Sequence, residues 1–202
     1  NEVRPGGAAN VAYNISNFHE NISLIGLVGD DDDSKTLDNL LKKNKIKCHF
    51  IKDPSYKTIT KLRIISKGNN QQLMRIDSEN LSSSFDKKLL NKHFFKHIKK
   101  ADIIVLSDYG KGSLFYSKEI IAFCRKIKKP VLVDPKGGNF DKYNGASIIT
   151  PNLSEFEEIA GHCRSEQEMN LKGKELLRKL KLKYLLITLG ERGMKLISKN
   201  NI

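Results

Sequence analysis

The fold of this chain is decided by residues 147–156, which read Ser-Ile-Ile-Thr-Pro-Asn-Leu-Ser-Glu-Phe. A short apolar run leads into a polar turn, and a helical pattern follows the turn. In open α/β sheets, a strand that ends in this way lies at the edge where ligands bind. Asn152 and Glu155 stand one helical turn apart at the expected helix start, where free N–H groups and the positive end of the helix dipole attract phosphate.

Two interpretations of Asn152 and Glu155 remain open from the motif alone. Asn-x-x-Glu is an ordinary capping box, in which each side chain caps the backbone of the other residue. A carboxylate here would also repel a phosphate unless a cation or a bridging water stood between them, which indicates a magnesium nucleotide. A short motif by itself is more typical of the capping box.

Further apolar runs alternate with stretches of helical period, and they occupy residues 23–28, 103–106, 131–133 and 185–188. This alternation predicts βαβ units and an α/β fold with a mostly parallel sheet, covered by helices on both faces. Residues 58–65 and 72–77 interrupt the alternation of strands and helices, because both are strand-like and they flank a loop rich in turn formers. They predict an inserted β-hairpin, which we interpret as a lid or a subunit contact.

The composition indicates a globular chain of 202 residues, with 39% hydrophobic and 29% charged residues. No apolar run approaches the roughly 20 residues that span a bilayer, and the first residues do not resemble a secretory signal. Three cysteines, Cys48, Cys124 and Cys163, are far apart and form no C-x-x-C pair. This argues against a disulfide framework or a zinc site and for a reducing, cytoplasmic environment. The lack of a spanning apolar run predicts no membrane association.

The formal charge of +13 raises the question of nucleic-acid binding. The lysines, however, occur in short scattered clusters, mostly near the ends of predicted helices, where cations suit the helix dipole. Aromatic residues make up only 7% of the chain, and tryptophan is absent. The sequence has no interleaving of aromatic and basic residues of the kind that stacks bases. We therefore expect no specific nucleic-acid binding.

Residues 4–12 read Arg-Pro-Gly-Gly-Ala-Ala-Asn-Val-Ala and form a second candidate site. Gly6 and Gly7 permit close approach of a ligand to the backbone, and Asn10 offers both a donor and an acceptor to a hydroxyl group. The simpler alternative is a tight turn before a closely packed helix.

Three further turns follow predicted strands. Asp108 and Lys136 lie in glycine-containing turns after the second and third of the alternating strands, and such turns suit recognition of phosphate and hydroxyl groups. Gly190 and Gly193 flank the last turn, which is either a hairpin connection or a backbone anion site.

Two patterns suggest metal sites but have simpler interpretations. Residues 29–33, Gly-Asp-Asp-Asp-Asp, lack the central glycine and closing glutamate of a calcium loop, and acidic residues favour the start of a helix. His93 and His97 are four residues apart, but no third ligand is convincingly placed, which favours an ordinary helix face.

Taken in chain order, the motifs resemble the ribokinase-like (PfkB) carbohydrate kinases. They are RPGGAANVA at 4–12, GLVGDDD at 26–32, TITKLRI at 58–64, LSDYGKGSL at 106–114, VDPKG at 133–137, TPNLSEFE at 150–157 and TLGERGM at 188–194. The similarity spans essentially the whole chain. Within that family it is greatest to the heptose 7-phosphate kinases, which form the kinase domain of a bifunctional kinase and adenylyltransferase in Gram-negative bacteria.

The resemblance implies where ligands bind. It implies a sugar-phosphate site made by Gly6, Gly7, Asn10, Asp108 and Lys136. It implies an ATP site made by Asn152, Leu153, Ser154, Glu155, Gly190 and Gly193. Glu155 would also reach Mg²⁺ through a metal-bound water, and a helix cap can coexist with this role. The hairpin, at about 56–78, would be the lid that covers the sugar and helps to form a homodimer.

The implied reaction is ATP-dependent phosphorylation of D-glycero-D-manno-heptose 7-phosphate at C1. The 1,7-bisphosphate would feed the synthesis of ADP-heptose for the lipopolysaccharide core. One alternative is a sibling sugar kinase that acts on ribose, fructose or fructose 6-phosphate. The other is a non-catalytic remnant that binds a sugar phosphate or a nucleotide.

Parts of the family pattern are not found in residues 1–202. The Gly-Ala-Gly-Asp segment, whose aspartate is the family's catalytic base, does not follow Gly193, and the strand that normally precedes residue 4 is missing. The adenylyltransferase domain is also absent. We therefore expect a partial kinase domain without its catalytic base, and no kinase activity from these residues alone.

Overall fold

The computed structural model describes residues 2–79, 87–111 and 113–199. The chain folds as two compact units, Asn1–Leu90 and Asn91–Ile202. Helix α3 (Lys87–Ile98) crosses the boundary between them. No helix in the described part of the chain is both long enough and apolar enough to span a membrane.

The first unit opens with a small α/β layer. Its elements are α1 (Gly7–Ser16), β1 (Ser23–Gly29), α2 (Asp32–Lys43) and β2 (Lys47–Asp53). Strands β1 and β2 pair in parallel, from Ser23 opposite Lys47 to Gly29 opposite Asp53. Local signals define α2, because Asp31 caps its start and Lys42 and Lys43 lie in its last turn.

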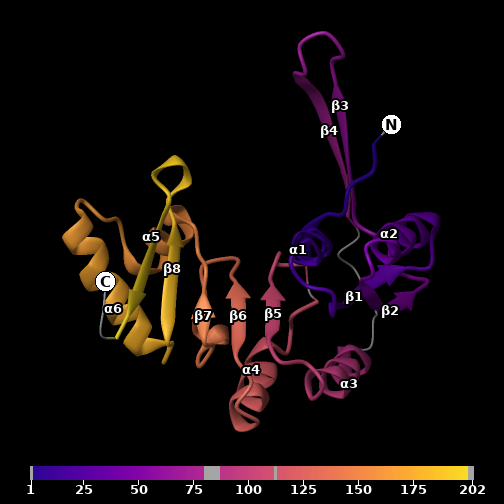
Figure 1. Ribbon diagram of the computed structural model, residues 1–202. Helices are drawn as coiled ribbons and strands as arrows, with labels where there is room; N and C mark the ends of the chain where they lie inside the picture. Colours follow the sequence, from indigo (N-terminus) through magenta and orange to yellow (C-terminus); the bar gives the residue numbers. More distant parts are fainter. Residues whose placement is uncertain (1, 80–86, 112, 200–202) are drawn as a thin grey trace. The chain divides into compact units, whose positions relative to one another are not determined.

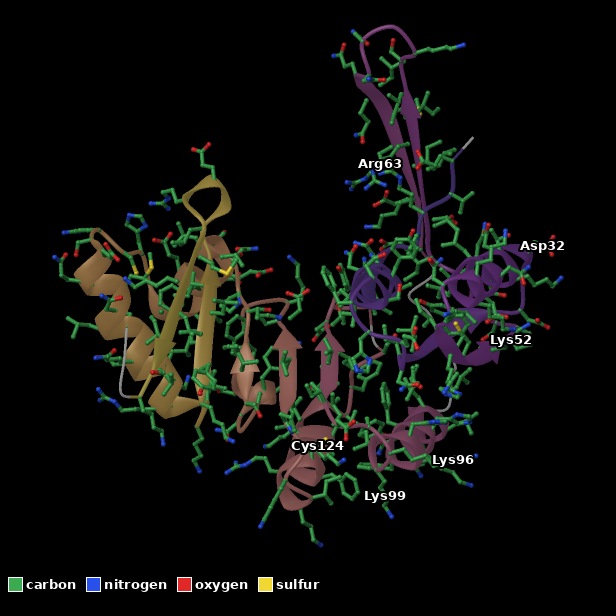
Figure 2. All side chains as sticks on the ribbon, viewed as in Figure 1. Asp32, Lys52, Arg63, Lys96, Lys99 and Cys124 are labelled. Carbon is green, nitrogen blue, oxygen red and sulfur yellow. The ribbon has the colours of Figure 1, made fainter. Side chains whose placement is uncertain are left out.

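A β-hairpin extends from this layer (Figure 1). It consists of β3 (Thr60–Ile65) and β4 (Gln72–Ser78), which pair antiparallel with a bulge between Ile64 and Ile65. Most of its residues are exposed. The cross-strand pairs Leu62–Ile76 and Ile64–Met74 make one face apolar. The other face carries charged residues such as Arg63, which is labelled in Figure 2.

The second unit is built on a five-stranded sheet of order β5-β6-β7-β8-β9. Its strands are β5 (Ile104–Ser107), β6 (Val131–Asp134), β7 (Ile148–Ile149), β8 (Tyr184–Thr188) and β9 (Met194–Ser198). All neighbouring strands pair in parallel except β8 and β9, which are antiparallel. The connections contain α4 (Ser117–Lys126), α5 (Leu153–Ala160), α6 (Glu166–Lys179) and the short 3-10 helices η1 (Asp141–Tyr143) and η2 (Gly190–Arg192).

One face of this sheet forms the core of the second unit. Alternate strand residues such as Leu106, Val133 and Leu185 are buried in one hydrophobic cluster with residues of α4, α5 and α6. Cys124 of α4, labelled in Figure 2, belongs to this cluster. Burial raises the pKa of its thiol to about 11. On the opposite face Leu196 is exposed.

The α/β fold with a mostly parallel sheet is confirmed, as is the inserted hairpin. The sequence analysis did not assign β2, because its apolar stretch is short, contains His49 and is flanked by the charged residues Lys47, Lys52 and Asp53. It also began the first hairpin strand at residue 58, whereas β3 begins at Thr60. Thr58 belongs instead to the connection before β3, where it is buried.

Candidate functional site

The parallel strands of the second unit bring several predicted site residues to one edge of the sheet. Asp108 follows β5, Lys136 lies shortly after β6, and Asn152 follows β7. The backbone ties these strand ends together: Asp108 N–H donates to Asp134 O at 2.9 Å, and Asn152 forms a parallel bridge with Thr188. The carboxyl edge of a parallel sheet is where α/β folds bind ligands.

The capping box predicted from Asn152 and Glu155 is present. Asn152 Oδ1 accepts a hydrogen bond from Glu155 N–H at 2.9 Å, and Glu155 Oε2 accepts one from Asn152 N–H at 3.1 Å. Leu153 and Ser154 form the first turn of α5, where Leu153 packs against the core and Ser154 is exposed. The structural interpretation of the motif is therefore confirmed, and its role toward ATP stays a prediction.

Glu155 also contacts a second predicted site residue. Its Oε1 accepts a hydrogen bond from Lys136 Nζ at 3.0 Å. The Glu155 side chain is 13% exposed, whereas that of Lys136 is 55% exposed. The hydrogen bond and the negative charge of Glu155 raise the pKa of Lys136. A half-exposed cation is thus held against a mostly buried carboxylate.

Asp134 adds negative charge to this edge; it belongs to the VDPKG motif, but the sequence analysis assigned it no role in a site. Burial raises the pKa of Asp134, and the neighbouring carboxylates of Glu155 and Asp108 raise it further against the lowering effect of Lys136. Crowded carboxylates favour a cation between them. Its position could have indicated this role. Asp134 is the last residue of β6 and pairs with Ser107, the last residue of β5, which Asp108 follows.

Asp108 is 7% exposed, and its carboxylate is occupied within the second unit. Oδ1 accepts from Gly110 N–H at 2.7 Å, and Oδ2 accepts from Tyr143 OH at 2.7 Å and from Lys142 Nζ at 2.8 Å. Burial alone would raise the pKa of Asp108, but these donors outweigh it and hold the pKa below its usual value.

Tyr143 and Lys142 were not identified from the sequence, although they hold Asp108 in place. Tyr143 is fully buried, and its hydroxyl accepts a hydrogen bond from Lys136 N–H at 3.2 Å. Burial and the hydrogen bond to Asp108 raise the pKa of the Tyr143 phenol, so it remains protonated and can donate. No local pattern marks this contact, because Tyr143 and Asp108 are 35 residues apart.

Gly190 and Gly193 lie in the connection between the antiparallel strands β8 and β9. Their φ angles are +64° and +83°, in the region that favours glycine. Leu189 N–H donates to Gly193 O at 2.8 Å, and Gly193 N–H donates to Gly190 O at 3.1 Å. The hairpin interpretation of this turn is confirmed, and an anion-binding role stays a prediction.

Gly6, Gly7 and Asn10 lie together at the start of α1 in the first unit. Gly6 caps α1 without a side-chain hydrogen bond, Gly7 has a φ of +54°, and Asn10 is exposed in the first turn. The structure thus groups these three residues with one another. It separately groups Asp108 and Lys136 with the residues around Asn152.

The two patterns that suggested metal sites have structural explanations. Asp31 of the acidic run caps α2, with Asp32 and Asp33 in its first turn. His93 and His97 lie on α3 with ring centroids 6.4 Å apart. Among residues 2–79, 87–111 and 113–199, no three His, Cys, Asp or Glu side chains are grouped as ligands of a metal ion. Gly112 of the turn after Asp108 lies outside the described residues.

The sequence profile described as pfkB family carbohydrate kinase matches residues 1–202. The chain belongs to the pfkB family of carbohydrate kinases. It is 44% identical over 198 residues to the bifunctional protein HldE of Coxiella burnetii, covering 98% of this chain and 41% of that protein. It is 45% identical over 197 residues to the bifunctional protein HldE of Photorhabdus laumondii, with the same coverage of 98% and 41%. The chain therefore spans about two fifths of the length of these relatives.

Solved structures of pfkB-type kinases share the fold. Arabidopsis thaliana ribokinase, complexed with ribose and ATP, matches with a TM-score of 0.78 and 16% identity, over 98% of this chain and 64% of that chain. Phosphofructokinase-2 from Escherichia coli, in complex with fructose-6-phosphate, matches with a TM-score of 0.76 and 15% identity, over 97% and 66%. These similarities confirm the ribokinase-like fold that the motifs implied.

Proposed function

We propose that the protein containing this chain transfers the γ-phosphate of ATP to the anomeric hydroxyl of D-glycero-D-manno-heptose 7-phosphate. The 1,7-bisphosphate formed would supply ADP-heptose for the lipopolysaccharide core. The observation that carries the proposal is the 44% identity to bifunctional HldE proteins across 98% of the chain. Residues 1–202 would form part of the kinase domain, with residues 56–78 as its lid. We also propose that the protein is located in the cytoplasm.

The carboxyl edge of the second unit fits a magnesium nucleotide. Mg²⁺ is usually held by one or two carboxylates together with waters and substrate phosphates. Glu155 and Asp134 supply two carboxylates, and the charge of Glu155 raises the pKa of Asp134. Both would hold the ion through bound waters. When bound, Mg²⁺ neutralises the phosphate charge that develops during transfer. Leu153 and Ser154 lie in the first turn of α5, where N–H groups have no partner within the helix and suit phosphates. Gly190 and Gly193 would lie beside the nucleotide.

The remaining residues would bind and orient the sugar. Gly6 and Gly7 expose backbone to the ligand, and the exposed amide of Asn10 can bond a hydroxyl in either direction. Lys136 can leave Glu155 for a phosphate oxygen, because its side chain is 55% exposed. Asp108 orders the turn that contains Gly110. Catalysis in such a site consists mainly of positioning and charge neutralisation.

The exposed surface of the hairpin favours its roles as a lid and as a dimer contact. Its apolar face, formed by Leu62, Ile64, Met74 and Ile76, is exposed along both strands. Exposed contiguous apolar surface of this kind is typical of an interaction site. We propose that it covers the bound sugar and packs against the hairpin of a second copy, which would form a homodimer.

A substrate panel on the complete protein tests the proposed function. Steady-state kcat/KM with ATP is measured for the heptose 7-phosphate, fructose 6-phosphate, fructose and ribose. The proposal predicts the highest kcat/KM for the heptose 7-phosphate. Preference for another sugar would establish a sibling kinase, and binding of sugar phosphate or ATP without turnover would establish a non-catalytic protein.

A further inference from the structure

Three segments of the first unit meet where the hairpin leaves it. Gly29 ends β1, Asp31 caps α2, and Thr58 lies in the connection just before β3. Thr58 is only 6% exposed, although most residues of the hairpin strands are exposed. The direction of the hairpin therefore depends on contacts at its base.

The contact at the base is a network of hydrogen bonds centred on Asp31. Asp31 Oδ2 accepts from Thr58 N–H at 2.8 Å, and Oδ1 accepts from the Thr58 hydroxyl at 2.7 Å and from Ser34 N–H at 2.8 Å. The Thr58 hydroxyl in turn accepts from Gly29 N–H at 2.9 Å. The single Thr58 side chain thus joins the end of β1 to the start of α2.

Helix capping does not explain the whole of this network. An N-cap needs one side-chain oxygen to accept from the first turn, and Oδ1 of Asp31 does so through Ser34. Oδ2 faces Thr58 N–H instead, outside the helix. Burial alone would raise the pKa of Asp31, but the N–H groups of Thr58 and Ser34 and their hydroxyls outweigh it and lower the pKa. The folded chain therefore favours the ionised carboxylate.

Close packing at Gly29 leaves the backbone at the base of the hairpin little room to move. A Cβ atom at this position would lie 2.5 Å from the carbonyl oxygen of Tyr56 and 2.9 Å from the nitrogen of Thr58, and it would also overlap Asp31 Oδ2. Two of these neighbours are backbone atoms, which cannot turn aside as a flexible side chain can. The segment before β3 is therefore held at both its backbone and its side chain.

We propose that Asp31 and Thr58 form a clamp that sets the direction of the hairpin, which makes Asp31 a positioning residue for binding of the sugar. This inference rests on the proposed function, in which the hairpin is the lid over the sugar. The clamp would hold the hairpin ready to close, so that the binding energy of the sugar is not spent on ordering it.

Three variants of the complete protein separate the clamp from helix capping. Thr58→Val removes the hydroxyl at nearly constant shape, and Thr58→Ser keeps it. Asp31→Asn preserves the cap when its Oδ1 keeps the bond from Ser34 N–H, since Asn and Asp are equivalent N-caps. The substitution removes the charge and places an amide donor opposite Thr58 N–H, where Oδ2 now accepts. Ser165→Ala is the matched control, because Ser165 caps α6 through Glu168 N–H and has no part in the hairpin.

Two measurements are made on each variant. Hydrogen exchange compares the amides of Gly29 and Thr58 with those of α2, and initial rates give the KM for the heptose phosphate and for ATP. We expect Thr58→Val and Asp31→Asn to speed exchange at Gly29 and Thr58 while α2 remains protected. Loss of hydrogen bonds to a charged group should raise the sugar KM about tenfold and leave the ATP KM nearly unchanged. Thr58→Ser and Ser165→Ala should remain near the wild type in both measurements.

Unchanged exchange at Gly29 and Thr58, or equal loosening of α2, would show that Asp31 only caps its helix. Faster exchange at the base with an unchanged sugar KM would overturn the positioning role. If the wild-type protein does not phosphorylate the heptose phosphate, the proposed function fails instead. The exchange data would then decide alone whether the clamp exists, because they require no substrate.

Discussion

The hydroxyl of Tyr143 donates a 2.7 Å hydrogen bond to Oδ2 of Asp108, and this bond joins the 3-10 helix η1 to the turn after β5. The same hydroxyl accepts from Lys136 N–H at 3.2 Å. One buried phenol therefore fixes two turns that carry predicted site residues. The shape of the site at the C-terminal ends of the parallel strands therefore depends on Tyr143, which belongs to none of the family motifs.

Removing the phenol hydroxyl should destabilise the second unit. Tyr143→Phe leaves Asp108 and Lys136 N–H each without one partner, and an unsatisfied buried group costs about 1–3 kcal/mol. Denaturant unfolding measures the change, with Tyr184→Phe as the control because Tyr184 is 46% exposed. Equal stability of the two variants would contradict the role assigned to Tyr143.

The stabilising effect of Asp108 should depend on pH. Its pKa is lowered in the folded chain, so its contribution is present above the unfolded pKa of about 3.9 and is lost as the pH falls through the folded pKa. The difference in unfolding free energy between the wild type and Asp108→Asn should therefore be largest near neutral pH and shrink in acid. Unfolding midpoints measured from neutral to acidic pH test this. A difference that stays constant would show that the charge of Asp108 is not what stabilises the fold.

Glu155→Gln separates the two interpretations of the Asn152 motif. Glutamine also serves in a capping box, so the fold should lose mainly the ion pair with Lys136. The Lys136 side chain is 55% exposed, so this pair is worth at most about 1 kcal/mol. Turnover by the complete protein should fall about a hundredfold, as expected when a preorganised charge is removed. Glu158→Gln on the same helix is the control. Retained turnover with a large fall in melting temperature would leave the motif as a cap only.

Asn10→Ala tests the proposed sugar site in the first unit. Loss of its hydrogen bonds should raise the KM for the heptose phosphate about tenfold and leave the KM for ATP nearly unchanged. Initial rates with each substrate varied in turn provide the measurement, and Asn14→Ala on the same helix controls for loss of an amide from α1. An equal rise in both KM values would contradict the assignment of Asn10 to the sugar.

Local signals predicted much of this structure. The apolar runs gave β1, β5, β6 and β8, and the spacing of Asn152 and Glu155 predicted a cap that is present. These features depend on neighbours within one or two turns of chain, so a sequence displays them directly.

The contacts that were missed join residues far apart in the sequence. Tyr143 is 35 residues from Asp108, and Thr58 is 27 residues from Asp31. Such pairs depend on strand register and on burial, which no local spacing encodes. The charge environment of Asp134 was missed for the same reason, because Glu155 and Asp108 reach it only after β5, β6 and α5 have assembled. β2 was missed because its apolar residues form only a short stretch between charged residues.

The central claim is tested most directly by the structure of the product. The complete protein is incubated with Mg²⁺, ATP and D-glycero-D-manno-heptose 7-phosphate, and the product is examined by ³¹P NMR with coupling to the sugar protons. The proposed function predicts a new phosphate ester coupled to the anomeric proton, with the 7-phosphate intact and ADP formed in equal amount. A new phosphate on another hydroxyl, or ADP with inorganic phosphate and unchanged sugar, would contradict it.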